Sequence, residues 1–149
     1  MFSHRAMHYC KGFTLLELLV SITIVGILMS FATFDYRALE NPVQNGAQAL
    51  MGFMKKTRAK ALASTLAYTI TAANSGRIIT TYSTVCSGTQ TADSSLTLNL
   101  PSSAHLTDTS WSICYNTRGL SDNSADIVVS DGTTTKTVQV VLGGGIRVI

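Results

Sequence analysis

A long apolar run opens the chain and dominates its hydropathy pattern. From Phe13 to Phe34 there are 22 residues, and Glu17 is the only ionisable one among them. As a helix with a rise of about 1.5 Å per residue, the run would reach about 33 Å, which matches a hydrocarbon core of about 30 Å. The pattern therefore predicts a transmembrane helix over residues 13–34.

A second helix is predicted from about residue 42 to residue 65. Asn41 is a favourable N-cap, and Pro42 is favoured at the first helical position. Apolar residues recur at helical spacing and form one stripe, which consists of Val43, Ala47, Leu50, Met54, Ala61 and Leu62. We expect this stripe to face a core, with Arg58 at its edge.

From Leu66 onward the pattern has a period of two and β-branched residues dominate, which predicts strands. We expect them over residues 66–73, 77–85, 96–100, 111–115, 127–130 and 135–142, with a final strand around Arg147. Asn74-Ser75-Gly76 and Asp131-Gly132 are typical hairpin turns, whereas residues 87–95 are polar and are expected to form a loop. The chain is predicted to be α+β, with one or two antiparallel sheets packed on the second helix.

Composition favours a secreted protein over a cytosolic enzyme. The 149 residues suit one domain with a membrane helix, and charged residues make up only 13% of them, about half the usual share. Before the apolar run, Arg5 and Lys11 stand without any acidic residue, which holds the N-terminus on the cytoplasmic side. The rest of the chain is therefore expected to lie outside the cytoplasm.

The apolar run lacks the cleavage site of an ordinary secretory signal. Residues 30–34 are a poor small-residue site, and the only sharp break is Lys11-Gly12 before Phe13. A cut there would keep the helix, free the amine of Phe13 and leave Glu17 as the fifth residue. A carboxylate at the centre of a membrane costs roughly 2.5–3.5 kcal/mol, so Glu17 favours a partner such as a neighbour's Phe13 amine or a helix N-terminus. The alternative is that Glu17 lies among head groups without a role.

The residues from Gly12 to Val20, Gly-Phe-Thr-Leu-Leu-Glu-Leu-Leu-Val, resemble the type III leader cleavage motif of type IV pilins and type II secretion pseudopilins. The resemblance implies that a prepilin peptidase removes residues 1–12 and that Phe13 is N-methylated. It also implies that Glu17 guides docking onto a growing fibre, whose core contains the helices 13–34 of many pilin subunits. Residues 35–149 would be the head, held first at the bacterial inner membrane and then in the periplasm or a surface pilus.

Three shorter segments, within residues 49–61, 113–119 and 144–148, resemble the GspH/FimT branch of minor pilins and pseudopilins. This resemblance implies a structural subunit, a minor pilin at or near the pilus tip that helps assembly. Two alternatives stay open: a DNA-binding FimT-like pilin for natural transformation, and the H-type pseudopilin of a type II secretion system. An adhesin is a further, weaker alternative.

FimT-type pilins bind DNA through a C-terminal Gly-Arg-x-Arg motif, and the matching place here is Gly144-Gly145-Ile146-Arg147. Arg147 is retained and Gly145 replaces the first arginine, so one phosphate contact is lost. The other candidates for contacts with double-stranded DNA are Arg118, Lys136, Lys56 and Lys60. Without the leader, 9 Lys and Arg stand against 8 Asp and Glu, so binding would need these cations to cluster. The alternative is that they are solvated surface charges.

The remaining chemistry is limited to one pair of cysteines. Cys10 lies in the leader, and Cys86 and Cys114 are expected to form a disulfide in an oxidising compartment, the alternative being two buried thiols. Once the leader is gone, His105 is the only histidine, and no metal-binding or nucleophile motif is present. We therefore expect no enzymatic activity, no metal and no cofactor.

Overall fold

The computed structural model describes residues 13–38 and 41–149, and the side chains of residues 31–38 are not described. The chain divides into two compact units, Met1–Glu40 and Asn41–Ile149, which are called here the N-terminal unit and the head. The predicted leader, with the cleavage site at Gly12, lies outside the described residues. Each unit is considered by itself.

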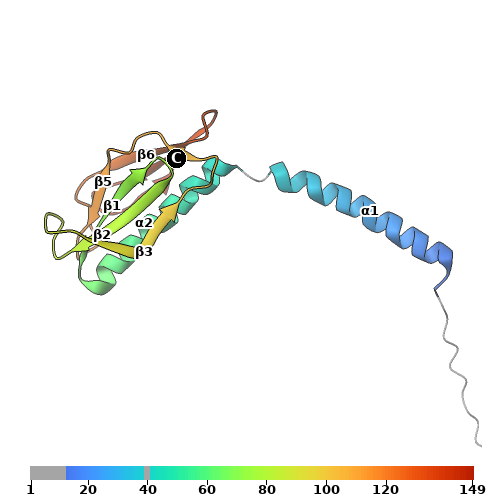
Figure 1. The fold of residues 1–149 in the computed structure, drawn as a ribbon, viewed down its shortest axis with the longest axis horizontal. Coiled ribbons are helices and arrows are strands. Elements are labelled where there is room, and N and C mark those ends of the chain that lie inside the picture. Colours follow the sequence, from blue (N-terminus) through green and yellow to red (C-terminus); the bar gives the residue numbers. More distant parts are fainter. Residues whose placement is uncertain (1–12, 39–40) are drawn as a thin grey trace, which may run out of the picture. The chain divides into compact units, whose positions relative to one another are not determined.

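The described part of the N-terminal unit contains the helix α1 (Leu15–Ala38), which is blue in Figure 1. Thr14 caps its start, since the Thr14 hydroxyl oxygen accepts a hydrogen bond from the Glu17 N–H at 3.2 Å. Within the helix, hydroxyl groups donate to backbone carbonyls one turn earlier, as Ser21 does to Glu17. The hydroxyl groups of Ser21, Thr23 and Ser30 are thereby satisfied inside an apolar helix. The helix continues beyond Phe34 to Ala38.

The second helix, α2 (Pro42–Ser64), confirms the predicted element. The Asn41 side-chain oxygen accepts a hydrogen bond from the Gln44 N–H at 3.0 Å, and Thr65 ends the helix in the left-handed conformation with a φ of 54°. The predicted stripe is buried except for Leu62, whose side chain is 49% exposed. At about 100° per residue, Leu62 points away from the buried face, because that face also includes Phe53 and Thr57.

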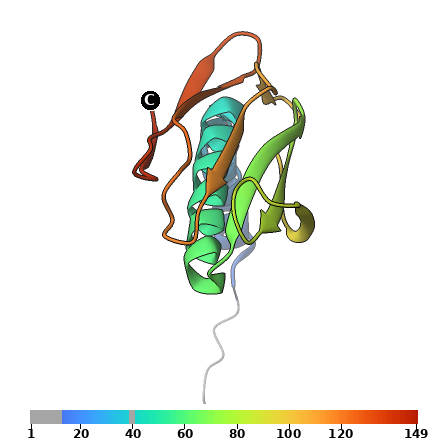
Figure 2. The same cartoon turned by 90° about the vertical axis from the view of Figure 1, so that its left-hand side faces the viewer.

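The head contains two four-stranded antiparallel sheets, so the two-sheet alternative is the one observed (Figures 1 and 2). The first has the order β3-β2-β1-β5 and consists of β1 (Ala67–Asn74), β2 (Arg77–Ser83), β3 (Thr91–Asn99) and β5 (Ser112–Tyr115). The second has the order β4-β6-β7-β8 and consists of β4 (His105–Leu106), β6 (Ala125–Ser130), β7 (Thr135–Val140) and β8 (Ile146–Val148). The helix α2 packs against strands of both sheets, which confirms the α+β prediction.

Both predicted hairpins are present. Between β1 and β2, the Asn74 side-chain oxygen accepts a hydrogen bond from the Gly76 N–H at 2.9 Å. Between β6 and β7, one Asp131 carboxylate oxygen accepts hydrogen bonds from the N–H groups of Thr133 and Thr134, at 2.8 and 2.7 Å. Gly132 has a φ of 89° there, a conformation that favours glycine. Short local sequences were therefore sufficient to place both turns.

The strand predictions were wrong in several places. Residues 91–95 were expected in a loop but form the first half of β3, where Thr91 pairs with Tyr82 and Ala92 with Thr81. They lie at the edge of a sheet, where polar side chains remain solvated and the alternating pattern that marks a half-buried strand is absent. The two-residue strand β4 was missed for a related reason, because it exists only through its pairing with β6. Strand β2 also ends two residues early, at Ser83.

The head has a hydrophobic core of its own, to which the described residues of α1 contribute nothing. The core lies between α2 and the two sheets, and its fully buried side chains include Val43, Leu50, Met54, Ile70, Ile78, Ile113, Ile127, Val129, Val138 and Val140. Since residues 41–149 bury this cluster without help from α1, the head is a domain that can fold alone.

Candidate functional site

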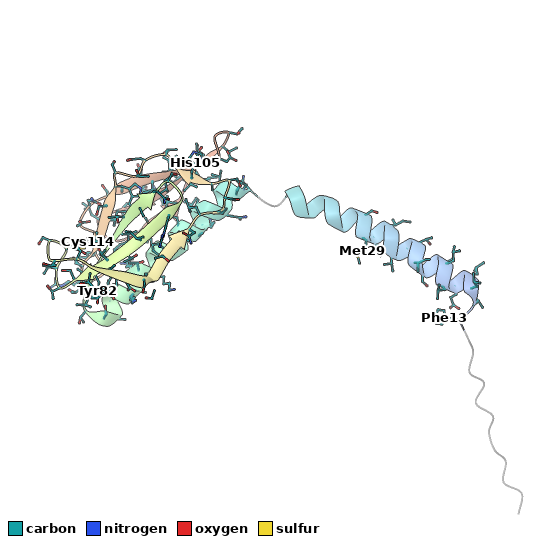
Figure 3. All side chains as sticks on the ribbon, viewed as in Figure 1. Phe13, Met29, Tyr82, His105 and Cys114 are labelled. Carbon is teal, nitrogen blue, oxygen red and sulfur yellow. A yellow bond between two sulfur atoms is a disulfide. The ribbon has the colours of Figure 1, made fainter. Side chains whose placement is uncertain are left out.

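The apolar side chains of α1 are exposed. From Phe13 to Met29, the exposed fractions of the large apolar side chains range from 45% for Val20 to 83% for Leu15. Figure 3 shows Phe13 and Met29 projecting outward from this helix. Such a surface is complementary to other apolar helices or to lipid, and not to water. Among the described residues, no helix is found that is both long and apolar enough to cross a membrane.

Glu17 lies in the first turn of α1, four residues after Phe13. Its backbone N–H donates to the Thr14 carbonyl oxygen at 3.1 Å as well as to the Thr14 hydroxyl. The Thr-x-x-Glu spacing is that of a capping box, and a carboxylate here complements the positive end of the helix dipole. Glu17 therefore supports the start of α1 and places a carboxyl group in its first turn.

In the head, Arg58 joins three segments that are far apart in the sequence. Its guanidinium donates from Nε to the Gly119 carbonyl oxygen at 2.8 Å, from Nη1 to that of Gly144 at 2.8 Å, and from Nη2 to that of Gly143 at 3.4 Å. The arrangement ties the C-terminal part of α2 to the loop after β5 and to the loop between β7 and β8. These four residues are called the arginine clamp below.

The clamp depends on glycine at two positions. Gly119 and Gly144 have φ values of 68° and 75°, in the left-handed region. A Cβ at Gly144 would collide with the Gly119 carbonyl oxygen and would lie 2.9 Å from Arg58 Nε, and one at Gly119 would lie 3.1 Å from the Leu62 side chain. The three segments that resemble GspH/FimT proteins thus meet at one place. Sequence analysis located Arg58 at the edge of a stripe, with no indication of its distant partners.

Tyr115 is fully buried, and it lies close enough to Arg58 for the positive charge of Arg58 to affect the pKa of Tyr115. Burial raises the pKa of Tyr115 to about 12, and the positive charge of Arg58 offsets only part of this rise. The phenol is therefore neutral at physiological pH and acts as part of the core under the clamp. It is not an exposed aromatic platform on which a base could stack.

Of the five candidate DNA-binding cations, Lys60 is already paired within the head. Lys60 Nζ lies 2.6 Å from Asp93 Oδ2 and donates to Ser95 Oγ at 2.9 Å. Burial alone would raise the pKa of the Asp93 carboxyl, but hydrogen bonds from Lys60 and Ser95 outweigh it and hold the pKa below its usual range. The sequence analysis missed this pair because Asp93 lies in the segment expected to be a loop.

Lys136 and Arg147 lie on opposite faces of the second sheet. Arg147 is opposite Gln139 on β7, and its Nε donates to Gln139 Oε1 at 2.8 Å. Lys136 is opposite Val129, which is buried, and alternation along β7 places it on the other face from Gln139. The structure therefore does not bring these two cations together.

Arg118 and Lys56 are both exposed, at different places. Arg118 precedes Gly119 in the clamp, and Arg147 follows Gly144 by three residues, so these two arginines flank contacting loops. Lys56 lies on the solvent side of α2. The five candidates consequently do not form one patch. Lys56 and Lys60 lie one turn apart on α2, whereas Arg118 and Arg147 flank the contacting loops.

The predicted disulfide is confirmed. Cys86 and Cys114 are joined, with their Cα atoms 5.8 Å apart. Cys86 follows β2 and Cys114 lies in β5, so the bridge connects the two neighbours of β1. The Cys114 N–H also donates to Asp122 Oδ1 at 2.9 Å, which anchors the loop after β5. The bridge therefore holds β5, and the clamp holds the loop that follows β5.

No metal centre is found in the described part of the chain, where no three His, Cys, Asp or Glu side chains lie together. His105 is exposed on the two-residue strand β4.

Comparison with known proteins agrees with these features. The profile of the prokaryotic N-terminal methylation motif matches residues 7–33. No curated protein sequence matches the chain. The fold is similar to that of the type IV minor pilin FimU of Pseudomonas aeruginosa strain PAO1 in two crystal forms. The first has 14% identity and a TM-score of 0.59, covering 73% of this chain and 89% of FimU. The second has 12% identity and a TM-score of 0.56, covering 71% and 91%.

At 14% and 12% identity, the similarity to FimU shows a common fold and nothing more. The N-terminal methylation motif is separate evidence, because it comes from the sequence. A methylation motif at the start of a long apolar helix is followed here by a head with the fold of a minor pilin. The chain is a member of the type IV pilin superfamily.

Proposed function

We propose that this protein is a minor pilin, a structural subunit without catalytic activity that joins a type IV pilus at or near its tip and helps to start assembly. The observation that carries the proposal is the exposure of large apolar side chains on every side of α1. The head buries its own core without α1, so the helix is free to bind other molecules. Lipid before assembly and the helices of other pilins afterwards are the surfaces that match it.

The N-terminal motif supports a route by which the protein would reach the pilus. A prepilin peptidase would cleave after Gly12, and Phe13 would be N-methylated. Before assembly the protein would be held in the inner membrane by residues 13–34, with its N-terminus in the cytoplasm. Extraction into the fibre would then replace lipid around α1 by neighbouring pilin helices, while the head remains in the periplasm or on the cell surface.

Glu17 provides the test. Glu17→Ala is expected to be processed normally but to be recovered in sheared fibres at least about tenfold less than wild type, because a lost charge partner worth roughly 1.4 kcal/mol or more lowers docking tenfold. The measurement is quantitative immunoblotting of the processed protein in membranes and in sheared fibres. Wild-type amounts of the alanine variant in fibres would refute a docking role.

Two further variants separate charge from helix capping. Glu17→Gln keeps a side chain able to complete the capping box but removes the charge, and it is expected to fail like alanine. Glu17→Asp keeps the charge and is expected to retain part of the incorporation. The same experiment addresses the H-type pseudopilin alternative, since a pseudopilin would be recovered only in fibres of the type II secretion system.

The DNA-capturing pilin remains a second candidate, favoured by the position of Arg118 and Arg147 beside contacting loops. Residues 41–149 carry 8 Lys and Arg against 5 Asp and Glu. If this surface captures DNA, Arg147→Ala is expected to weaken binding about threefold to tenfold and to lower the salt slope by about one. The measurement is a titration of the head with labelled double-stranded DNA at low and moderate salt.

Lys136→Ala is the matched control, because it removes the same charge from the opposite face of the sheet. A defined DNA surface at Arg147 predicts that the Lys136 variant binds like wild type. Equal weakening in both variants would indicate only general electrostatic attraction. Absence of binding at low salt would leave the structural subunit as the sole proposal.

A further inference from the structure

Three exposed leucines are neighbours of arginine-clamp residues, either directly in the chain or one turn away on α2. Leu62 follows Arg58 by one turn of α2, Leu120 follows Gly119, and Leu142 precedes Gly143. Their side chains are 49%, 42% and 59% exposed, in a head that otherwise buries most of its large aliphatic side chains. One of these leucines comes from each of the three segments that the clamp joins. They are called the clamp leucines.

The clamp holds these leucines on a fixed framework. Arg58 donates to carbonyl groups next to both loop leucines, at 2.8 Å to Gly119 and 3.4 Å to Gly143. The loop of Leu142 is further closed by the Gly144 N–H, which donates to the Val141 carbonyl oxygen at 2.7 Å. Side chains presented by an ordered backbone lose little entropy on binding, which favours their use in recognition.

The clamp leucines lie far from the point where α1 joins the head. Arg58 is 16 residues beyond Pro42, which corresponds to about 24 Å along α2. Figure 1 shows α2 running from its first residue, Pro42, toward the opposite end of the head. A partner at the clamp leucines would therefore meet the head at a distance from its helical anchor.

We infer that the clamp leucines dock against the head of a neighbouring pilin subunit in the fibre, an inference that rests on the proposed function. Three half-exposed leucines present roughly 200–300 Å² of apolar surface, well below the about 800 Å² per partner of a stable complex. This area is too small to join free heads. It is sufficient for heads whose α1 helices already hold them side by side, where the effective concentration reaches about the millimolar range.

The chemistry of the surface favours this occupant over a nucleic acid. The three side chains are uncharged, whereas DNA binding draws its affinity mainly from cations that contact phosphates. Arg118 is exposed on the same loop as Leu120 and suits a carboxylate on the rim of a protein partner. An apolar centre with a charged rim is the usual composition of a protein–protein contact.

The test replaces all three leucines in the full-length chain, as Leu62→Gln, Leu120→Gln and Leu142→Gln together. Processing and membrane levels are expected to be unchanged, while recovery in sheared fibres falls about tenfold. Ile149→Gln is the matched control, because Ile149 is 57% exposed and lies opposite Thr137, away from the clamp. It is expected to enter fibres like wild type. The melting temperature of the head, measured for both variants, confirms that these surface changes leave folding intact.

A second measurement identifies the occupant. A photo-cross-linking residue at position 142 is expected to yield an adduct with another pilin in intact fibres, and purified heads are expected to sediment as monomers. Recovery of the triple variant at wild-type levels would overturn the inference and leave the proposed function in place. Dimers of free heads at micromolar concentration would also overturn it, in favour of a second copy. Absence of the wild-type protein from fibres would overturn the proposed function itself.

Discussion

The head in which Cys86 and Cys114 are both replaced by serine is expected to melt roughly 15 °C below the wild-type head. The two cysteines are 28 residues apart, and closing a loop of that length stabilises a fold by about 3–4 kcal/mol through the unfolded state. In a domain of about one hundred residues, each kcal/mol corresponds to about 4 °C or more. The bridge also fixes the loop after β2 to β5, so its loss is expected to loosen that end of the head first.

The measurement is thermal unfolding of residues 41–149 followed by circular dichroism. The double variant is used because a single replacement would leave a thiol able to form intermolecular bridges. Adding a reductant provides the control: it is expected to lower the wild-type transition to that of the variant and to leave the variant unchanged. A variant that melts within about 2 °C of wild type would show that the bridge contributes little to stability.

The second large effect is expected from Arg58→Ala. The guanidinium makes three hydrogen bonds to carbonyl groups, and those of Gly119 and Gly144 belong to buried residues. Hydrogen bonds to a charged group contribute about 1.5–3 kcal/mol, and a buried acceptor left unpaired adds a further cost. We therefore expect the free energy of unfolding to fall by about 2–4 kcal/mol. Amide hydrogen exchange should accelerate most in the loops that contain Gly119 and Gly144.

Two variants make this prediction specific to the clamp. Lys56→Ala removes a cation from the exposed side of the same helix and is expected to change stability by no more than about 0.5 kcal/mol. Arg58→Lys keeps the charge but cannot donate in a fork to three separate carbonyl groups, so it should restore only part of the loss. If Arg58→Ala is as stable as Lys56→Ala in urea unfolding, the clamp is not a significant contributor to the fold.

Several features of the protein were predictable because they depend on residues that are close in the sequence. Asn41 caps α2 through a hydrogen bond to a residue three positions later, and Asp131 organises its turn in the same way. The apolar helix that begins near Phe13 and the two hairpins belong to this class. The cysteine pair was predictable for another reason, because only two cysteines remain without the leader. The α+β fold and the superfamily followed from them together with the N-terminal motif. Cleavage at Gly12, methylation of Phe13 and docking through Glu17 stay predictions.

Errors in the sequence analysis occurred where a distant partner decides the outcome. Residues 91–95 are polar and lack alternation, yet pairing with β2 makes them a strand. That strand carries Asp93 to Lys60, 33 positions away, and so removes one candidate DNA contact. Leu62 was assigned to the buried stripe, but the direction from which the sheets cover α2 leaves it half exposed. Local patterns contain no information on any of these three outcomes.

By itself, then, the sequence determined what each segment is: an apolar helix with an N-terminal carboxylate, an amphipathic helix, hairpin strands and a linked pair of cysteines. Only the tertiary structure decided which polar groups are used internally and which face outward. Arg58 is bound by glycines 61 to 86 positions away, and Lys136 and Arg147 lie on opposite faces. The physical reason is that helix and turn formation depend on neighbours within a few residues. The face that a strand residue occupies, and the partner that a charge finds, depend on register and packing with segments elsewhere in the chain.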